Sequence, residues 1–430
     1  MAVSGRFVLL VALGIVPLVL IGEPWVLGGW MLVVAALTAL DLGVAGSPRQ
    51  IELSRTVPAR VRLGETVQAT LVVTNPGSRR VTGVLRDAWQ PSAGAVSTRS
   101  RISIPGGERR AVTTTLTPFR RGERRAVHVT VRSFGPLGLA ARQATLSAPA
   151  TLRVLPPFDS RKHLPSRLAR LRELDGRTSV MIRGQGTEFD SLREYVRGDD
   201  VRSIDWRATA RRNDLVVRTW RPERDRRVVI VIDSGRTSAA RIDNEPRIDT
   251  AYESALLLAA LASRAGDRVD VVIYDRRVRG RVQGATGADL LSRLVDTMAP
   301  VDPELIEMDW AAVPALVRSI TSQHSLVVLA TSIDAPGASR GLLAVLPQLT
   351  RKHTVVVASV TDPSVLAATL DRSDRSAVYR AAAAERAVLD VARVSAAVRQ
   401  LGGEVVTGAP ADLPPALADT YIALKAAGRL

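Results

Sequence analysis

The fold is decided by one short apolar run, Arg227-Val228-Val229-Ile230-Val231-Ile232-Asp233. Its consecutive branched aliphatic residues leave no polar face, so the run predicts a parallel strand that is buried on both faces of a sheet. The sequence after this run alternates between strand-like and helix-like patterns. Strands are expected at 268–274, 325–330 and 354–360, and helices at 249–265, 288–298, 310–320, 342–350 and 379–401. This alternation predicts a doubly wound α/β domain over residues 228–430.

Ligands of doubly wound sheets bind beyond the carboxyl ends of the strands, and Asp233 lies at such an end. Hydroxyl side chains follow it in Ser234-Gly235-Arg236-Thr237-Ser238. Carboxylate and hydroxyl oxygens suit Mg²⁺, so Asp233, Ser234 and Thr237 are the candidate metal ligands. A single carboxylate holds a hard dication weakly, however. We therefore expect that Asp233 braces the turn after it and that no cofactor is bound, with a Mg²⁺ site as the alternative.

Residues 50–156 show a different pattern, in which Thr and Val alternate with a period of two. The runs at 66–73, 111–116 and 126–131 are typical of antiparallel strands. Turn-forming residues separate such runs at 75–77, 105–107 and 121–123. The spacing predicts about seven strands and hence a small antiparallel β-sandwich of Ig-like type.

Residues 1–46 contain two apolar runs, 7–21 and 25–40, joined by Gly22-Glu23-Pro24. Each run with its flanks approaches the roughly 20 residues that cross a bilayer as a helix. The pattern predicts a transmembrane helical hairpin in the cell (inner) membrane, with residues 7–44 in contact with lipid. A signal peptide is the alternative for the first run, but no small-x-small cleavage site follows Ile21. Arginines flank the hairpin at 6, 49, 55, 60 and 62, so both termini are expected in the cytoplasm.

Composition excludes several classes of function. The 430 residues contain no Cys, which removes thiol nucleophiles, disulfides, Cys-ligated zinc and iron–sulfur clusters. The four histidines, at 128, 163, 324 and 353, are not spaced as a helical metal pair. The net charge of +17 comes almost wholly from arginine, and it leaves binding of anionic lipid or nucleic acid as an alternative function. The arginines lack interleaved aromatics, which argues against nucleic acid.

A charged segment, residues 157–227, separates the predicted sandwich from the predicted α/β domain. Acids and arginines alternate densely in its second half. Arg–carboxylate pairs can be bidentate and directional. This sequence therefore predicts a segment held in shape by ion pairs, here called the clasp, with a structural or interaction role. The candidate clasp residues are Glu188, Arg193, Tyr195, Asp199, Asp200, Arg202, Asp205, Trp206 and Arg211.

The clasp resembles the signature of the domain-of-unknown-function 58 family. The resemblance is carried by Glu188-Phe189, Arg193-Glu194-Tyr195, Gly198-Asp199-Asp200-Val201-Arg202, Ile204-Asp205-Trp206 and Ala210-Arg211. In that family a transmembrane hairpin and a β-sandwich commonly precede the signature, and a von Willebrand factor A-like domain follows it. The resemblance therefore implies a von Willebrand factor A-like fold for residues 228–430 and association with a MoxR-type AAA+ ATPase.

The resemblance also implies a degenerate metal site. A von Willebrand factor A domain holds its ion with an Asp-x-Ser-x-Ser loop, a threonine and a second aspartate. Here Gly235 stands at the first serine position and Thr237 at the second. Met308 falls near the threonine position, and Ser332 occupies the place of the aspartate. Mg²⁺ would therefore lack most of its usual ligands.

Catalytic motifs are missing from the sequence. It has no P-loop, no complete dinucleotide fingerprint and no Gly-x-Ser-x-Gly elbow. We therefore expect a membrane-anchored, cytoplasmic-facing scaffold or adaptor rather than an enzyme, with a protein partner bound through the α/β domain. The alternative is a metal-dependent hydrolase that combines Asp233 with Asp199, Asp200 or Asp205. Neighbouring arginines should lower the pKa values of the clasp acids, which argues against that role.

Overall fold

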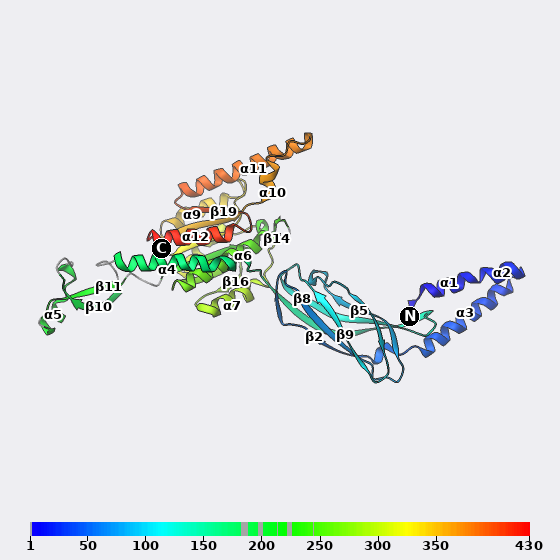
Figure 1. Ribbon diagram of the computed structural model, residues 1–430. Helices are drawn as coiled ribbons and strands as arrows, with labels where there is room; N and C mark the ends of the chain where they lie inside the picture. Colours follow the sequence, from blue (N-terminus) through cyan, green and yellow to red (C-terminus); the bar gives the residue numbers. More distant parts are fainter. Residues whose placement is uncertain (1, 182–187, 197–200, 213, 222–225, 244) are drawn as a thin grey trace. The chain divides into compact units, whose positions relative to one another are not determined.

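The computed structural model describes residues 2–181, 188–196, 201–212, 214–221, 226–243 and 245–430, with the backbone alone for 175–181, 188–191, 212 and 219–221. The chain divides into two compact units, Met1–Leu155 and Pro156–Leu430 (Figure 1). The division falls beside the Pro156-Pro157 pair. The predicted segments 157–227 and 228–430 therefore lie together in the second unit.

Unit 1 begins with three apolar helices, α1 (Gly5–Leu13), α2 (Ile15–Ile21) and α3 (Trp25–Val44). Gly22 ends α2 in the left-handed conformation, with φ of 76°. The chain then reverses, and α3 runs back beside α1 and α2 (Figure 1). Among the described residues, one helix is long and apolar enough to cross a membrane, Trp25–Gln50, and the apolar stretch Gly5–Ile21 is shorter.

One tryptophan joins the two arms of this helical pair. Trp30 Nε1 in α3 donates a hydrogen bond to the Leu10 carbonyl in α1 at 3.0 Å. Gly14, between α1 and α2, lies against the indole ring, and a Cβ at that position would come within 2.3 Å of it. The bare glycine therefore permits the close approach of the arms, as small residues do between membrane helices.

The rest of unit 1 is a sandwich of two sheets. The smaller sheet has the order β2 (Glu52–Thr56), β4 (Val67–Thr74) and β7 (Arg109–Leu116). The larger sheet contains β1 (Ala2–Val3), β9 (Ala140–Leu155), β8 (Gly122–Phe134), β5 (Val81–Trp89) and β6 (Arg99–Ile104), and β3 (Arg60–Arg62) pairs with β9. All pairs are antiparallel except β3 with β9. Short 3₁₀ helices lie at Pro48–Gln50 and Pro91–Ala93.

The alternating Thr and Val pattern has the structural result expected of it. In β4 every second residue is buried, including Leu71 and Val73. These side chains share one core with Leu85 of β5 and Val131 of β8, which belong to the other sheet. The two sheets therefore pack face to face, as in a β-sandwich.

Unit 2 is built on a six-stranded sheet. Its order is β16 (Val278–Val282), β15 (Arg268–Tyr274), β12 (Arg227–Asp233), β17 (Leu326–Ala330), β18 (Thr354–Val360) and β19 (Glu404–Gly408). Only the pairing of β16 with β15 is antiparallel among these described strands. Strand β12, the apolar run that predicted this fold, lies in the interior of the sheet and is buried along its apolar length. The predicted doubly wound arrangement is present.

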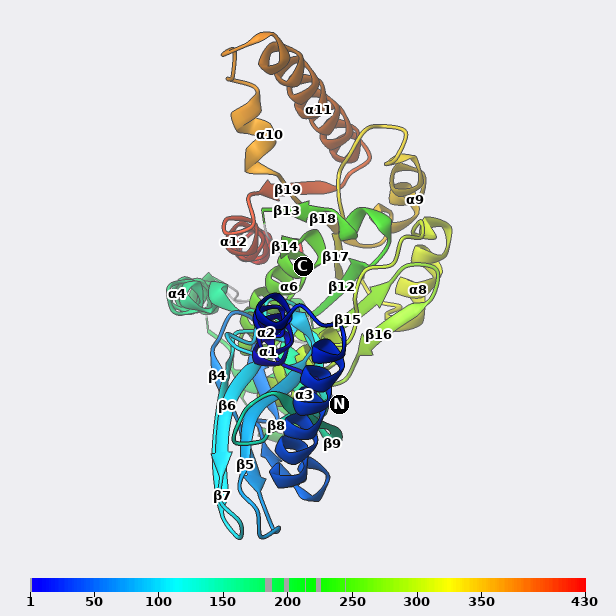
Figure 2. The same cartoon turned by 90° about the vertical axis from the view of Figure 1, so that its right-hand side faces the viewer.

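Helices cover both faces of this sheet (Figure 2). Helices α8 (Val313–Ile320), α9 (Arg340–Thr350) and α11 (Arg375–Gln400) share a core with β12, β17 and β18. Helix α6 (Arg247–Arg264) contacts β12, β15 and β18, and α12 (Leu413–Ala426) lies beside it. The remaining helices of this sheet's connections are α7 (Gly287–Met298) and α10 (Pro363–Ala368).

The segment before β12 contributes further elements. Helix α4 (Leu164–Met181) contacts α6 and α12, and both Arg167 and Arg170 pair with Asp419 of α12, at 2.6 and 2.9 Å. A two-stranded sheet, β10 (Glu188–Glu194) with β11 (Val216–Arg221), carries α5 (Trp206–Arg212) between its strands. A second small ribbon consists of β13 (Arg241–Ile242) and β14 (Glu245–Pro246). Short 3₁₀ helices lie at Asp159–His163, Val201–Ser203, Arg236–Ala239 and Trp310–Ala312.

Replacement of Gly83 by alanine should destabilise the sandwich. A Cβ on Gly83 in β5 would lie 1.8 Å from the Arg132 carbonyl oxygen of β8, and backbone on both sides leaves no room for relief. We expect Gly83→Ala to lower the free energy of unfolding by about 3 kcal/mol. Urea-induced unfolding of the full chain in detergent, followed by circular dichroism, measures this change. Gly29→Ala is the matched control, because nothing lies within 4 Å of that Cβ; equal midpoints for both variants would contradict the prediction.

Candidate functional site

Asp233 occupies the edge at which this type of fold binds ligands. It is the last residue of β12. The chain order reverses here, because β15 lies on one side of β12 and β17 on the other. A crevice forms at such a switch point, beyond the carboxyl ends of the strands. Asp233 is buried in this position, with 3% of its surface exposed.

The Asp233 carboxylate accepts hydrogen bonds on both oxygens. Oδ1 accepts from the Gly235 backbone N–H at 2.7 Å. Oδ2 accepts from the hydroxyls of Thr331 at 2.7 Å and Thr237 at 3.4 Å. Burial raises the pKa of Asp233, because the charged form loses hydration, and these hydrogen bonds oppose the rise only in part. Asp233 therefore braces the loops that surround it.

Gly235 explains why one serine of the metal motif is missing. A Cβ at this position would lie 2.8 Å from the Ile306 carbonyl oxygen and 3.3 Å from the Met308 nitrogen. The Arg236 N–H donates to the same Ile306 oxygen at 2.8 Å. The loop at 306–308 thus passes so close to the turn after β12 that a side chain at 235 has no space.

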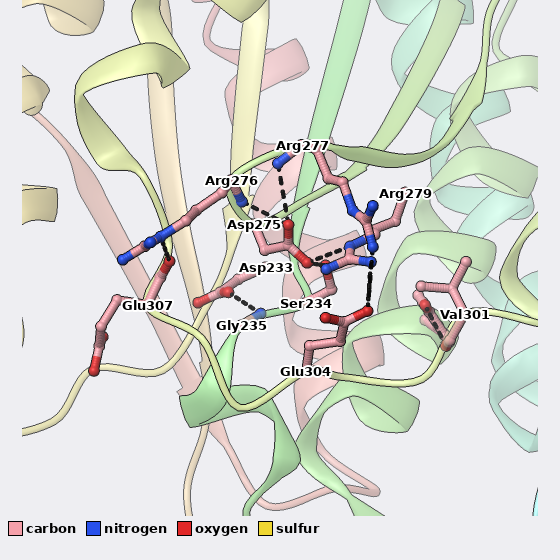
Figure 3. A network of polar contacts seen from close by, with 11 residues as sticks. Asp233, Ser234, Gly235, Asp275, Arg276, Arg277, Arg279, Val301, Glu304 and Glu307 are labelled. Atoms are coloured by element: carbon pink, nitrogen blue, oxygen red, sulfur yellow. Dashed lines mark hydrogen bonds and ion pairs between the residues drawn. The ribbon is translucent and has the colours of Figure 1, made fainter.

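Ser234 turns away from Asp233 and serves a second buried acid. Its hydroxyl donates to Asp275 Oδ2 at 3.2 Å (Figure 3). Asp275 directly follows β15, the strand next to β12, and none of its surface is exposed. The sequence carried a signal for this residue, since Asp275 follows an apolar strand just as Asp233 ends one. The two acids thus lie at the carboxyl ends of neighbouring parallel strands.

Asp275 is held as a charged group. Oδ1 accepts from the backbone N–H groups of Arg276 at 2.5 Å and Arg277 at 3.1 Å. Oδ2 accepts from Arg279 Nε at 2.5 Å. Burial alone would raise the pKa of Asp275, but the hydrogen bonds from Arg279, Arg277 and Arg276 outweigh it and hold the pKa below its ordinary value.

Charged side chains on the loops of the sheet edge lie around these two acids, and Figure 3 labels Arg277, Glu304 and Glu307 among them. Glu304 pairs with Arg279 and lies 3.6 Å from Arg277. Glu307 pairs with Arg236 at 2.7 Å, and both of these side chains are more than half exposed. We call Arg236, Arg277, Glu304 and Glu307 the charged rim. It presents both signs of charge to solvent.

The metal motif positions meet in a small recess beside the rim. Asp233, Thr237, Met308 and Ser332 line it together, whereas Ser234 does not. Glu307 and Asp334 also line the recess, but Glu307 pairs with Arg236 and Asp334 with Arg247 at 3.1 Å. Within the described parts of the chain, no three acidic or histidine side chains are grouped as metal ligands. The residues present therefore do not fit the oxygen ligand set of Mg²⁺.

The clasp is organised around Asp205. Its Oδ1 accepts from the N–H groups of Arg207 and Ala208, both at 3.0 Å, which caps the start of α5. Its Oδ2 accepts from Arg218 Nε at 2.8 Å. The hydrogen bond from Ala208 and then the Arg218 guanidinium lower the pKa of Asp205, the direction expected from its arginine neighbours. Arg218 was not among the predicted clasp residues.

The other predicted clasp residues have separate positions. Glu188 and Arg193 lie in β10. The Tyr195 N–H donates to the Leu215 carbonyl at 2.8 Å. Arg202 lies in the 3₁₀ helix before α5, Arg211 lies in α5, and Trp206, also in α5, is 67% exposed. Asp199 and Asp200 lie outside the described residues.

The family comparison gives one clear result. Residues 191–399 match the family described as "Protein of unknown function DUF58". The predicted family resemblance is confirmed for this part of the chain. It includes the clasp from Ser191 onward, the recess and most of the α/β sheet.

Relatives and solved structures add limited detail. The uncharacterized proteins Mb1516 of Mycobacterium bovis and Rv1480 of Mycobacterium tuberculosis are each 28% identical over 186 residues, which is 43% of this chain and 57% of the relative. The chain thus spans little more than half the length of these relatives. The VWA domain of SpRpn10 matches 45% of this chain and 94% of its own at 8% identity, with a TM-score of 0.28. The CARDB domain of PF1109 from Pyrococcus furiosus matches 26% of this chain and 91% of its own at 15% identity, with a TM-score of 0.19. Similarity at these TM-scores does not establish a shared fold.

The two buried acids should respond to pH in opposite ways. The raised pKa of Asp233 means that its stabilising contribution is present below the unfolded pKa, about 3.9, and is lost as pH rises through the folded value. We expect Asp233→Asn to increase the free energy of unfolding at pH 7 and to lose this advantage toward pH values of about 4. Urea unfolding across that pH range measures the difference.

Asp275→Asn is the comparison variant. The lowered pKa of Asp275 gives stability that is present above about pH 3.9 and is lost only as pH falls through the folded value. Removal of this charge leaves Arg279 with less compensation, so we expect a loss of about 3 kcal/mol at pH 7. The assignment is wrong if both variants change stability in the same direction at neutral pH.

Metal binding can be tested directly. We expect calorimetric titration of the full chain with Mg²⁺ or Mn²⁺ to give no saturable heat up to about 1 mM, because the recess offers too few free carboxylates. A saturable isotherm that disappears in Asp233→Ala would overturn this expectation and favour the metal-dependent hydrolase.

Proposed function

We propose that this chain is a membrane-anchored scaffold or adaptor without enzymatic activity, and that it binds a protein partner through the charged rim of its α/β unit. The observation that carries the proposal is the state of the two acids at the sheet edge. Asp233 and Asp275 both have their oxygens engaged by donors of the same unit. A catalytic acid or base must instead exchange a proton with substrate within hydrogen-bond reach. Carboxylates held in this way stiffen loops.

The stiffened loops present a surface suited to a protein. Arg236 and Glu307 are 57% and 63% exposed by side chain, and Arg277 and Glu304 extend the rim. Exposed charges of both signs contribute orientation and partner choice more than affinity. Met308 and Trp310, which line the adjoining recess, supply apolar surface of the kind that anchors interfaces. A rigid, mixed-charge surface with an apolar recess favours protein docking.

The membrane anchor is the second part of the proposal. We infer that α1 with α2, and α3, cross the inner membrane as a hairpin with both termini in the cytoplasm. Large apolar side chains face outward on all three helices, and Leu9, Leu20, Leu32 and Leu40 are between 62% and 78% exposed. Contiguous apolar surface of this kind is unfavourable in water and favourable in lipid. Arg6 precedes the hairpin and Arg49 follows it, which supports this orientation.

The finer assignments rest on the family resemblance. We propose that the sandwich is Ig-like and that the α/β unit is von Willebrand factor A-like. Support comes from two sheets around one core in the first case and from a doubly wound sheet with one antiparallel edge strand in the second. The proposed partner is a MoxR-type AAA+ ATPase, because that ATPase accompanies the family that the clasp resembles.

The docking surface can be tested by site-specific cross-linking in native membranes. A photo-reactive amino acid at Glu307 lies on the charged rim, and we expect it to cross-link a protein that mass spectrometry identifies as an AAA+ ATPase. The matched control is the same amino acid at Lys352, which is exposed just before β18 and therefore lies at the amino end of a parallel strand, at the opposite sheet edge. Equal products from both positions, or no AAA+ protein at Glu307, would contradict the proposal.

A further inference from the structure

Both arms of the helical pair are fixed to one turn of the sandwich, residues 135–139 between β8 and β9. Asp41, in the last turn of α3, is buried with 1% of its surface exposed. Its carboxylate accepts from the N–H groups of Leu137 and Leu139, both at 2.8 Å, and of Ala140 at 3.3 Å. A Cβ on Gly135 would lie 2.2 Å from the same carboxylate. Hydrogen bonds from several N–H groups to one buried carboxylate are strong and directional, so they hold the end of α3 in one orientation on this turn.

The start of α1 contacts the same turn. Ser4, which caps α1, donates from its N–H to the Leu139 carbonyl at 3.0 Å and from its hydroxyl to the Gly138 carbonyl at 2.6 Å. The strand before it, β1, pairs with β9. The start of α1 and the end of α3 are therefore both fixed to this turn. We call Ser4, Asp41 and the turn 135–139 the foot of the hairpin.

A second sandwich turn adjoins the foot. The Arg79 guanidinium donates to the Gly43 carbonyl in the last turn of α3. A Cβ on Gly46 would lie 2.5 Å from the Arg80 carbonyl oxygen, so the chain after α3 passes directly over this turn. Asn75 Nδ2 holds the turn in shape by donating to the carbonyls of Arg79, Ile104 and Pro105 at 2.9 to 3.2 Å. Two sandwich turns are thus rigidly placed at the helix ends.

Arginines and apolar side chains meet at the foot. Arg6, Arg49, Arg79 and Arg80 are all exposed there, on three different segments. Leu137, in the turn itself, is 43% exposed, and Leu40 and Val44 at the end of α3 are 62% and 50% exposed. Glu108 lies near the second turn, but it pairs with Arg110 at 3.0 Å. Exposed apolar surface next to a belt of arginines matches the boundary between hydrocarbon and lipid headgroups.

We propose that the foot is a binding site for anionic phospholipid, in which Arg6, Arg49, Arg79 and Arg80 contact headgroup phosphates and Leu137 enters the edge of the hydrocarbon layer. This inference rests on the proposed membrane anchor. A guanidinium carries five N–H donors in a planar fork that suits phosphate oxygens. Arg6 uses one nitrogen for the Leu137 carbonyl at 3.3 Å and Arg79 one for Gly43. The remaining donors of both are suited to bind lipid.

Lipid selectivity is the first test. The full chain is reconstituted in phosphatidylcholine vesicles, and electron paramagnetic resonance measures its relative association with spin-labelled phosphatidylglycerol and spin-labelled phosphatidylcholine. We expect phosphatidylglycerol to be preferred. Arg49→Gln with Arg80→Gln should reduce the preference by up to roughly fivefold for each arginine removed, because each cation near a charged surface contributes a comparable factor. These two arginines do not hold the foot together, so the variant should fold.

The matched control removes two arginines from the other end of the sandwich. Arg120 follows β7 and Arg125 lies near the start of β8, so both are about 30 Å from the foot along the strands. This distance exceeds the Debye length in physiological salt several times over. Arg120→Gln with Arg125→Gln should therefore leave the lipid preference unchanged. An equal loss in both double variants would mean a general charge effect and would overturn the inference.

A fluorescent label at Leu137 gives an independent measurement. Because the chain contains no Cys, a single Cys at position 137 can be labelled uniquely with an environment-sensitive nitrobenzoxadiazole dye. We expect a blue-shifted emission that lipid-borne quenchers reduce. The same label at Phe119, which is 60% exposed near the opposite end of the sandwich, should report water. Identical emission from the two positions would contradict insertion of the turn.

The two levels of the proposal fail in different ways. If alkaline carbonate extracts the chain from vesicles, the membrane anchor itself is wrong, and the lipid site falls with it. If the chain stays in the bilayer but shows no preference for phosphatidylglycerol, the anchor stands and the lipid site is wrong. Binding of fluorescent single-stranded DNA by the same four arginines, lost in the Arg49 and Arg80 variant, would assign the surface to nucleic acid and overturn the lipid site.

Discussion

The burial of one strand on both faces is the constraint on which unit 2 depends. Parallel strands β15 and β17 take up the backbone hydrogen bonds of β12 on its two sides. Val229 and Val231 face the core shared with α8, α9 and α11, and the alternate residues Ile230 and Ile232 are also fully buried. Each such side chain contributes about 2 kcal/mol on burial, so this strand alone supplies a gross term comparable to the net stability of a whole domain. Helices must therefore cover both faces, as they do.

The same constraint creates the polar cluster at the sheet edge. A strand buried on both faces ends inside the protein, so the backbone and loops that leave it need buried hydrogen-bond partners. Asp233 and Asp275 meet that need at adjacent strand ends, and the loops after β12 and β15 fold around them. Because a fully satisfied polar network specifies one loop arrangement, the acids give the edge a defined shape. The clasp uses a carboxylate in the same way, because Asp205 accepts hydrogen bonds both from the N–H groups at the start of α5 and from Arg218.

The sequence predicts those parts of the fold in which one face, or both, must be apolar. The strands at 268–274 and 354–360 were predicted with the bounds that the structure has, because a short run rich in branched aliphatic residues favours a buried strand. Strands β16 and β19 were not predicted, since Val-Arg-Gly-Arg-Val and Glu-Val-Val-Thr-Gly lie at sheet edges and carry polar residues. Asp41 was not predicted because its hydrogen-bond donors lie 96 to 99 residues away in sequence. Asp275 was not predicted although, like Asp233, it stands at the end of an apolar strand. Local sequence periodicity predicts which segments form strands and helices. It does not predict which distant residues will hydrogen-bond a buried carboxylate such as that of Asp41.

Strand geometry alone sets the distance between the helical pair and the end of unit 1. Strand β9 begins at Ala140, directly after the turn that Asp41 holds, and ends at Leu155, where unit 1 ends. Sixteen residues of extended chain span about 50 Å. Because β9 is paired along its length with β8, it cannot bend as a free linker would. The foot fixes one end of this strand at the helices, so the chain leaves unit 1 at a set distance from them. A sandwich joined rigidly to the helical pair in this way differs from a flexible tether, because it fixes both the direction and the separation of its two ends.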